Sequence, residues 1–516
     1  MVFQYSSPVR RNGKGENLDP FPNEIYAEIL HYVQPDRQDN AEYHRQLSKI
    51  ALVCRYFCFL MVPRLFDTLI FDGSTEAKGP TPNYSGFCRS IIKDEGQARE
   101  LAKYVRTCRV LNWLPDEGFG QISSAAASFL KLHFSAMVFM ENLSSLIIDK
   151  IILTSQVLRA LSELKKLKHL ELTDFKEMKG CRAGDYKKLA CLRLTTLKMH
   201  NSNDKPAFDW ANYKQLGQAF DYSHLETLLT SIPSSVTVIQ KSTHPSPLRT
   251  LELKLYNLQE VTLDTSLFRR LPELRRFEIA PTGYNQLAGV VLKPSDIPLL
   301  EDVECLPAHL ALLVPGRPVS RVTITLSPRS FQYAPQSPAF LEPLARSTAA
   351  AINLSLPFTW FAHYIEAAHS YLAKVNKLRL FCLYRDLDTN PEILKTLATA
   401  IPMLPQIRHI QAEPGPGWMG IIPTTFDKIN LKEQAAILSG IPSSSKVEDL
   451  QLGLIKWSRD RDGKWTPSFE DELRDSLETQ LEKVSNWADY LERSDLEDYM
   501  KNLFACPTSE SSSESK

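Results

Sequence analysis

The sequence has no excess of charge of either sign and no long apolar run. Its 516 residues include 60 Lys and Arg and 60 Asp and Glu, so the formal net charge is zero. This balance removes any whole-chain reason to expect a polyanionic partner such as DNA, RNA or an acidic membrane face. The longest apolar run, residues 50–62, is interrupted by Arg55 and is shorter than the about 20 residues that a membrane-spanning helix needs. We therefore expect neither a nucleic acid nor a membrane as partner.

Paired cysteines, an apolar leader and a metal-binding motif are also missing. The nine cysteines are scattered and odd in number, unlike those of a disulfide-stapled secreted domain, so we expect reduced intracellular thiols. Cys54 and Cys58 lie one helical turn apart, but no further Cys or His pair is near, which favours small buried thiols over a metal site. Arg10, Arg11 and Lys14 are not followed by an apolar stretch, so no signal peptide is predicted. These features predict a cytoplasmic or nuclear protein.

Motifs of catalysis are absent or stand in the wrong context. The sequence contains no G-x-x-x-x-G-K-[ST], no G-x-S-x-G and no HExxH. Residues 415–420 match G-x-G-x-x-G, but Pro414, Pro416 and Pro423 bracket them, which favours a loop over a phosphate cradle at a helix start. We therefore expect no catalytic residue, no cofactor and no metal.

The middle of the chain repeats one pattern of apolar residues. An apolar residue is followed by a second three positions later and a third two positions after that, as in Leu167, Leu170 and Leu172. We call the central residue of each copy a marker. The markers are Leu146, Leu170, Leu197, Leu251, Phe277, Val303, Val322, Leu378, Ile410 and Leu450. Weaker copies, residues 225–228 and 352–356, fill the two long gaps between markers.

The spacing of the markers predicts short parallel strands joined by helical segments. A period in the high twenties resembles a leucine-rich repeat, whose units run about 20 to 29 residues. Segments between markers, such as residues 155–164, carry apolar residues at helical spacing. One unit cannot bury its apolar face alone, so stacked units create a continuous core. We therefore predict an α/β fold with an irregular leucine-rich-repeat solenoid over residues 100–466 and an amphipathic capping helix over residues 467–505, a cap being favoured over a docking helix.

Composition sets the remaining boundaries. We expect a flexible N-terminal arm over residues 1–17, a helical block over residues 18–72, and a linker with the entry to the array over residues 73–99. Residues 467–516 hold 13 acidic and 5 basic residues, which predicts a solvated acidic face. Residues 506–516 are polar and of low complexity, so a disordered tail is predicted there.

The helical block carries more apolar surface than it can bury. A first helix is predicted to begin at Pro22 and to stop at Pro35, and a polar loop is predicted over residues 36–45. Between Ile50 and Val62, eleven of thirteen residues are apolar, which predicts one helix that is apolar on nearly every side. A block of about 55 residues buries only about 60% of its chain surface. Burial against a partner protein is therefore favoured over a purely internal core.

The same block resembles an F-box. The residues that carry the resemblance are Phe21, Pro22, Glu24, Ile25, Ile29, Leu30, Leu47, Ala51 to Arg55, Phe57 and Pro63 to Phe66. With its repeats, the chain is similar to fungal F-box proteins that carry degenerate leucine-rich repeats. The resemblance implies that an F-box over residues 18–72 docks on a Skp-family adaptor and through it on a cullin, and that the repeats present an unknown target protein to the ubiquitin ligase. By motif position it implies that the adaptor-binding residues are Pro22, Ile25, Ile29, Leu52, Val53, Cys54 and Phe57.

Two other functions remain open at this point. The chain could be a repeat scaffold that binds a partner protein outside any ligase, in which case substitutions in the helical block would only destabilise folding. It could also be a hydrolase with a site spread over the array, which a probe for activated Ser or Cys nucleophiles would label.

Overall fold

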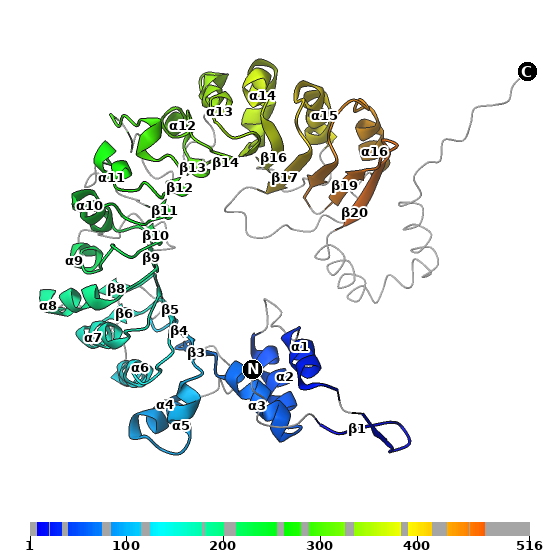
Figure 1. Ribbon diagram of the computed structural model, residues 1–516. Coiled ribbons are helices and arrows are strands. Elements are labelled where there is room, and N and C mark those ends of the chain that lie inside the picture. The colour runs from blue at the N-terminus through cyan, green and yellow to red at the C-terminus, as the bar shows by residue number, and fades with distance from the viewer. Residues whose placement is uncertain are drawn as a thin grey trace, which may run out of the picture. The chain divides into compact units, whose positions relative to one another are not determined.

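The computed structural model divides into two compact units, Met1–Leu248 with Lys254–Val261, and Arg249–Leu253 with Thr262–Lys516. In each, the parallel strands alternate with helices along the chain, and these helices lie on one side of the sheet (Figure 1). No helix of the described segments is long and apolar enough to cross a membrane. The structure describes residues 8–19, 21–32, 40–74, 84–114, 124–177, 181–200, 213–254, 263–279, 287, 289–325, 335–382, 391–414, 431–453 and 455–469.

The first unit begins with a small hairpin followed by three helices. The hairpin pairs β1 (Arg10–Arg11) with β2 (Asn17–Leu18) in antiparallel register. The helices are α1 (Asn23–His31), α2 (Asn40–Ala51) and α3 (Arg55–Leu65). The expected flexible arm over residues 1–17 is therefore wrong for residues 10–17, and residues 1–7 lie outside the described part of the chain.

The apolar run over residues 50–62 is not one helix. Helix α2 ends at Ala51, and Cys54 takes an extended conformation (φ −161°, ψ 168°) before α3 begins. The predicted loop over residues 36–45 is also too long, because α2 already begins at Asn40. The turn at residues 52–54 lets the run avoid a helix that would need cover on every side.

A parallel sheet follows the helices in the first unit. Its strands, in the order in which they lie side by side, are β3 (Thr68–Asp72), β4 (Thr107–Leu111), β5 (Ser145–Asp149), β7 (His169–Thr173), β9 (Thr196–His200) and β10 (Thr227–Thr230). A separate short pair is formed by β6 (Ile152–Leu153) and β8 (Lys176–Glu177). The helices of this part are α4 (Tyr84–Lys93), α5 (Ala98–Ala102), α6 (Ser124–Met137), α7 (Ser155–Glu163), α8 (Ala183–Lys187), η1 (Lys188–Cys191), α9 (Lys214–Gly217) and α10 (Pro233–Lys241).

The second unit continues the same construction and ends differently. Its strands, again in spatial order, are β11 (Thr250–Leu253), β12 (Arg276–Ile279), β13 (Asp302–Cys305), β14 (Arg321–Ile324), β15 (Ile352–Pro357), β16 (Val375–Cys382), β17 (His409–Pro414), β18 (Asp449–Leu452), β19 (Ile455–Arg459) and β20 (Trp465–Phe469). All pairs up to β18 are parallel, whereas β19 and β20 are added in antiparallel fashion. Its helices are α11 (Thr265–Arg269), η4 (Pro294–Asp296), α12 (Pro307–Leu313), η5 (Pro338–Leu341), α13 (Glu342–Ala345), α14 (Phe358–Ala368), η6 (His369–Leu372), α15 (Pro391–Ala400), η8 (Ile401–Met403) and α16 (Leu431–Ser439).

The markers predicted from the sequence pair with one another in register. Leu170 is the partner of Leu146 on one side and of Leu197 on the other. The weaker copies pair in the same register. Leu228 pairs with Leu197, and Leu354 pairs with the markers of both neighbouring strands. Every marker is at most 1% exposed, so all lie on the buried face of their sheet. The predicted strand positions are confirmed, and the chain is a mixed α/β protein built on mostly parallel sheet.

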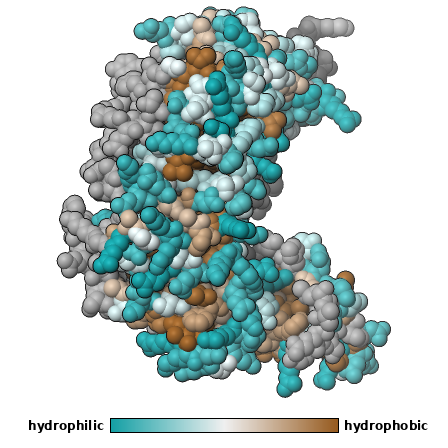
Figure 2. All heavy atoms as spheres, turned by 60° about the vertical axis from the view of Figure 1, so that its left-hand side comes forward, coloured by the Kyte–Doolittle hydropathy of each residue, from teal (hydrophilic) through white to brown (hydrophobic). Residues whose placement is uncertain are grey.

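The helices turn an apolar stripe toward the sheet. In α7, the Thr154 hydroxyl accepts a hydrogen bond from the backbone N–H of Val157 and so caps the helix start. Val157, Leu158 and Leu161 are buried, at spacings that share one helix face. On the face drawn in Figure 2, hydrophilic residues cover most of the surface, and apolar residues show between them. This is the pattern of amphipathic helices that cover a core.

Three strand ends of the first unit use a left-handed residue that is not glycine. Asn112, Lys150 and Asp174 follow β4, β5 and β7 and have φ of 59°, 52° and 48°. The backbone N–H of each continues the ladder by donating to the next strand, as Lys150 does to the Thr173 carbonyl at 3.0 Å. This conformation is comfortable for Asn and Asp and strained for Lys.

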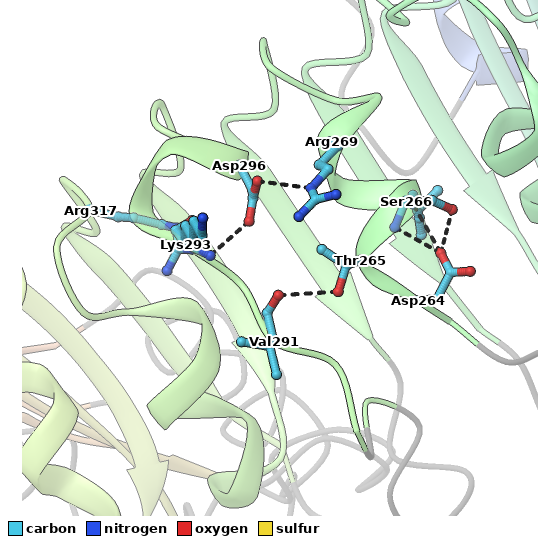
Figure 3. Close-up of polar contacts among 9 residues, drawn as sticks. Asp264, Thr265, Ser266, Arg269, Val291, Lys293, Asp296 and Arg317 are labelled. Carbon is cyan, nitrogen blue, oxygen red and sulfur yellow. Dashed lines mark hydrogen bonds and ion pairs between the residues drawn. The ribbon is translucent and has the colours of Figure 1, made fainter.

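Polar contacts on the helix side join successive strand–helix repeats within the second unit (Figure 3). The Asp264 carboxylate caps α11 by accepting from the backbone N–H of Ser266 at 2.8 Å. From the end of that helix, the Arg269 guanidinium lies 3.4 Å from the Asp296 carboxylate of the next strand–helix repeat. Asp296 also accepts from the backbone N–H of Lys293 at 2.7 Å, which fixes the start of η4. Each contact either holds one strand–helix repeat against the next or caps a helix.

Arg317 is the most deeply buried charge in this network. It is 1% exposed, and burial lowers the pKa of its guanidinium. One terminal nitrogen donates to the carbonyls of Leu312 and Leu313 at 3.0 and 3.1 Å, and the other donates to the Lys293 carbonyl at 2.7 Å. The side chain therefore ties the end of α12 to the preceding strand–helix repeat, which contains Lys293.

The boundaries of the array shift at both ends. Strand β3 belongs to the sheet although it lies in the block predicted over residues 18–72, and its Leu69 pairs with Cys108 of β4. Helix α4 and the start of α5 lie in the stretch predicted as a linker and entry to the array, residues 73–99. At the other end, the capping helix predicted over residues 467–505 is wrong for residues 467–469, which lie in β20. The rest of that predicted helix, the predicted tail over 506–516 and the glycine motif at 415–420 lie outside the described residues.

Candidate functional site

The three N-terminal helices share a small core of their own. Leu30 of α1, Leu47 of α2 and Met61 of α3 are buried in it. Partly buried hydrophobic residues pack around these three, namely Tyr43, Ile50, Ala51, Phe57, Leu60 and Leu65. Side chains from the apolar run over residues 50–62, with others from the same three helices, thus hold the block together.

Two polar contacts fix α1 beside α3. The Tyr56 hydroxyl donates to the Asn23 carbonyl at 2.8 Å, and the Arg64 guanidinium donates to the Leu30 carbonyl. Because the first contact joins the two helix starts and the second joins the two helix ends, α1 and α3 run in the same direction. Burial, and to a lesser extent Glu24, raises the pKa of Tyr56, so its hydroxyl remains a donor at neutral pH.

Several large apolar side chains of the block stay partly or mostly exposed. Ile25 and Ile29, one turn apart on α1, are 44% and 51% exposed. Leu52 and Val53, in the turn before α3, are 86% and 68% exposed, and Phe21, just before α1, is 38% exposed. We call these five residues the apolar surface. Exposed apolar residues gathered on one small element mark an interaction site more often than single ones do.

Three members of the apolar surface, Phe21, Leu52 and Val53, lie at one end of the block. Val53 precedes Cys54, the residue from which α3 begins, and the Tyr56 contact places that beginning against the start of α1. Phe21 stands at the start of α1, where its ring lies 5.8 Å from that of Tyr26. Leu52 and Val53 therefore lie at the same end of the block as Phe21.

The seven residues predicted to bind an adaptor divide into two groups. Pro22, Ile25, Ile29, Leu52 and Val53 are exposed, as a docking role requires. The other two, Cys54 and Phe57, are half-buried, and the Phe57 ring packs against the core and against Tyr26 at 5.4 Å.

Two exposed aromatic residues lie outside the predicted docking set, and two thiols are less buried than predicted. Phe21 and Tyr32 were not counted among the docking residues, although Tyr32 is 75% exposed and follows Ile25 by seven positions. That spacing places both on one face of a helix and could have shown it. The thiols of Cys54 and Cys58 were expected to be buried, but Cys54 is half-buried and Cys58 is exposed. Within the described residues no three His, Cys, Asp or Glu side chains are placed to hold a metal ion.

The polar face of the second unit's sheet carries a row of carboxylates. Glu252, Glu278 and Glu304 stand directly opposite one another on β11, β12 and β13. Like charges in this arrangement repel, and Arg276 relieves part of the repulsion from 3.5 Å of Glu252 and 3.0 Å of Glu278. Burial, with the neighbouring Glu278, raises the pKa of Glu304 to about 7. The row is therefore a largely buried cluster of carboxylates, since the Glu252 and Glu278 side chains are only 19% and 14% exposed.

The buried thiols do not resemble activated nucleophiles. Burial raises the pKa of Cys88 to about 12 and that of Cys382 to about 12. It also raises the pKa of Cys108 and Cys305. A nucleophilic cysteine needs the opposite shift, because the thiolate is the reactive form. These four thiols therefore lack the lowered pKa that a nucleophilic cysteine needs.

Comparisons with known proteins give little to set beside these observations. No protein-family model matches the chain, and no curated protein matches its sequence. Among solved structures, the chain is similar to a chain of the TLR13–ssRNA13 complex at 11% identity and a TM-score of 0.25, over 70% of this chain and 56% of that one. The match thus spans little more than half of that structure's length. We draw nothing about fold or function from a likeness of this size.

Proposed function

We propose that this chain is the substrate-recognition subunit of a Skp-cullin-F-box ubiquitin ligase. The three N-terminal helices would be the F-box, and the apolar surface formed by Phe21, Ile25, Ile29, Leu52 and Val53 would dock on the Skp-family adaptor. The exposure of that surface is the observation that carries the proposal. Complete burial of a Leu or Ile side chain contributes about 1.5 to 3 kcal/mol, so a partner that covers several of them gains substantial affinity.

The strand and helix units would be degenerate leucine-rich repeats that bind the target protein. Their support is the in-register pairing of markers at a period typical of that repeat. In this proposal the protein performs no chemistry. It raises the effective concentration of target lysines near the ubiquitin-bearing subunit, and proximity of this kind accelerates a reaction without a new catalytic group. The proposal places the protein in the cytoplasm or the nucleus, with the adaptor and a cullin.

A binding experiment with the full chain tests the proposal. We expect a purified Skp-family adaptor to form a stoichiometric complex on size-exclusion chromatography, and Leu52→Asp to abolish it. Val291→Asp is the matched control, because Val291 is 73% exposed and lies in the second unit. If the unaltered chain forms no complex, or if both substitutions act alike, the proposal is wrong. A folded chain that binds another protein and ignores the adaptor would instead be a scaffold.

A further inference from the structure

The N-terminal hairpin is fastened to the apolar surface by one arginine. The Arg10 guanidinium lies over the Phe21 ring, 3.6 Å from its centroid. The same guanidinium donates to the Asp19 carbonyl at 3.2 Å. A cation above an aromatic face is attracted by the ring quadrupole, so Arg10 holds the hairpin against a residue of the apolar surface.

The two faces of the hairpin differ in composition. Arg10 stands opposite Leu18, and Arg11 stands opposite Asn17. Side chains of successive strand residues point to opposite faces, so Arg10 and Leu18 share the face that meets Phe21, and Arg11 and Asn17 share the other. Leu18 is 39% exposed. Leu18 is thus an exposed apolar residue on the hairpin face from which Arg10 reaches the Phe21 ring.

We propose that the Arg10–Leu18 face of the hairpin is a second element of the adaptor-docking surface. This inference rests on the proposed function. The occupant is the same adaptor that covers Phe21, because the hairpin face is continuous with that ring through the Arg10 contact. The turn that closes the hairpin is built from local bonds, since the Asn12 side-chain carbonyl accepts from the backbone N–H groups of Lys14 and Glu16 at 2.9 and 3.0 Å. The element is thus preorganised before it binds, which lowers the cost of ordering it.

Two pairs of neighbouring substitutions test the assignment in the full chain with a purified Skp-family adaptor. Arg10→Ala and Leu18→Asp alter the face that meets Phe21. Arg11→Ala and Asn17→Asp make the same changes of charge on the opposite face. We expect Arg10→Ala to weaken binding by about threefold to tenfold and Leu18→Asp by at least about tenfold. The two control variants should stay within about twofold of the unaltered chain.

The outcomes separate this inference from the proposed function. If Leu52→Asp abolishes binding and all four hairpin variants bind normally, the hairpin assignment is overturned and the proposed function stands. If the unaltered chain does not bind the adaptor, both fail. Equal losses in the two pairs would show a general charge effect and would also overturn the assignment, as would variants that change self-association and leave adaptor binding intact. Hydrogen exchange provides a second test, because adaptor binding should slow the exchange of backbone amides at residues 8–19.

Discussion

Leu52 separates docking from folding more cleanly than any other residue of the apolar surface. Leu52→Ala removes three carbon groups, each of which contributes about 0.8 kcal/mol when it leaves water. Since 86% of this residue is exposed in the chain alone, a partner that covers it completely gains about 2 kcal/mol from those groups, or about 30-fold in Kd. The same exposure means that the free energy of unfolding should change by no more than about 0.5 kcal/mol.

Leu47→Ala is the matched control for this prediction. Leu47 is fully buried in the core of the same block, so its truncation should cost about 2 to 5 kcal/mol of stability. Isothermal titration with the adaptor measures the binding, and urea unfolding measures the stability. If Leu52→Ala binds as tightly as the unaltered chain, the apolar surface is not a docking site. If it destabilises the chain as much as Leu47→Ala, the turn at residues 52–54 is not exposed as described.

Three further predictions concern the array. Arg317→Met should destabilise the second unit by at least about 2 kcal/mol in urea unfolding, because it strands buried carbonyls. Arg408→Met, which breaks an ion pair with Glu448 in which both side chains are more than half exposed, should cost less than about 1 kcal/mol; similar values would contradict the role of Arg317. Lys150→Gly should raise the unfolding free energy by about 1 kcal/mol by relieving a left-handed conformation, and a loss of stability would refute that reading of the turn. Burial lowers the pKa of His133 from 6.5 to about 4. As the pH falls, His133 is therefore protonated in the unfolded chain before it is protonated in the folded chain. Stability should then drop by about 2 kcal/mol between about pH 7.5 and pH 5, and His133→Phe should remove that part of the drop; an unchanged slope would show that His133 is not buried neutral.

The strands of the array were predictable because one constraint repeats. Each marker must fill the same place in a continuous core, so the apolar cadence survives even where the residue changes, as at Phe277 and Val303. Strand β4 carries no marker because its central position is Cys108, so that copy does not stand out as a leucine pattern.

The end of the array held a local signal that was not used. Asp462 and Gly463 lie between two runs of alternating apolar residues, which is a strong indication of a hairpin. The structure places them in the connection between β19 and β20, where Gly463 has φ of 83°. The antiparallel strands follow from that turn, whereas parallel strands need a longer crossover.

The candidate site was predictable in composition and not in local geometry. The excess of apolar residues in the block is visible in the sequence, and five of the seven residues singled out are exposed. The break between α2 and α3 contains neither Gly nor Pro, so no local rule marks it. Only the packing of Phe57 into the core shows why that residue differs from Leu52 and Val53.

The register of the markers also bears on how such a chain changes over evolutionary time. Leu170 meets Leu146 and Leu197 in the same way, so excision of its whole strand and helix would leave two edges that already match. Duplication of the same stretch would insert an element that both flanks can accept. Variation in the number of units therefore requires no coordinated change elsewhere in the protein, and the surface available to ligands can lengthen or shorten in steps.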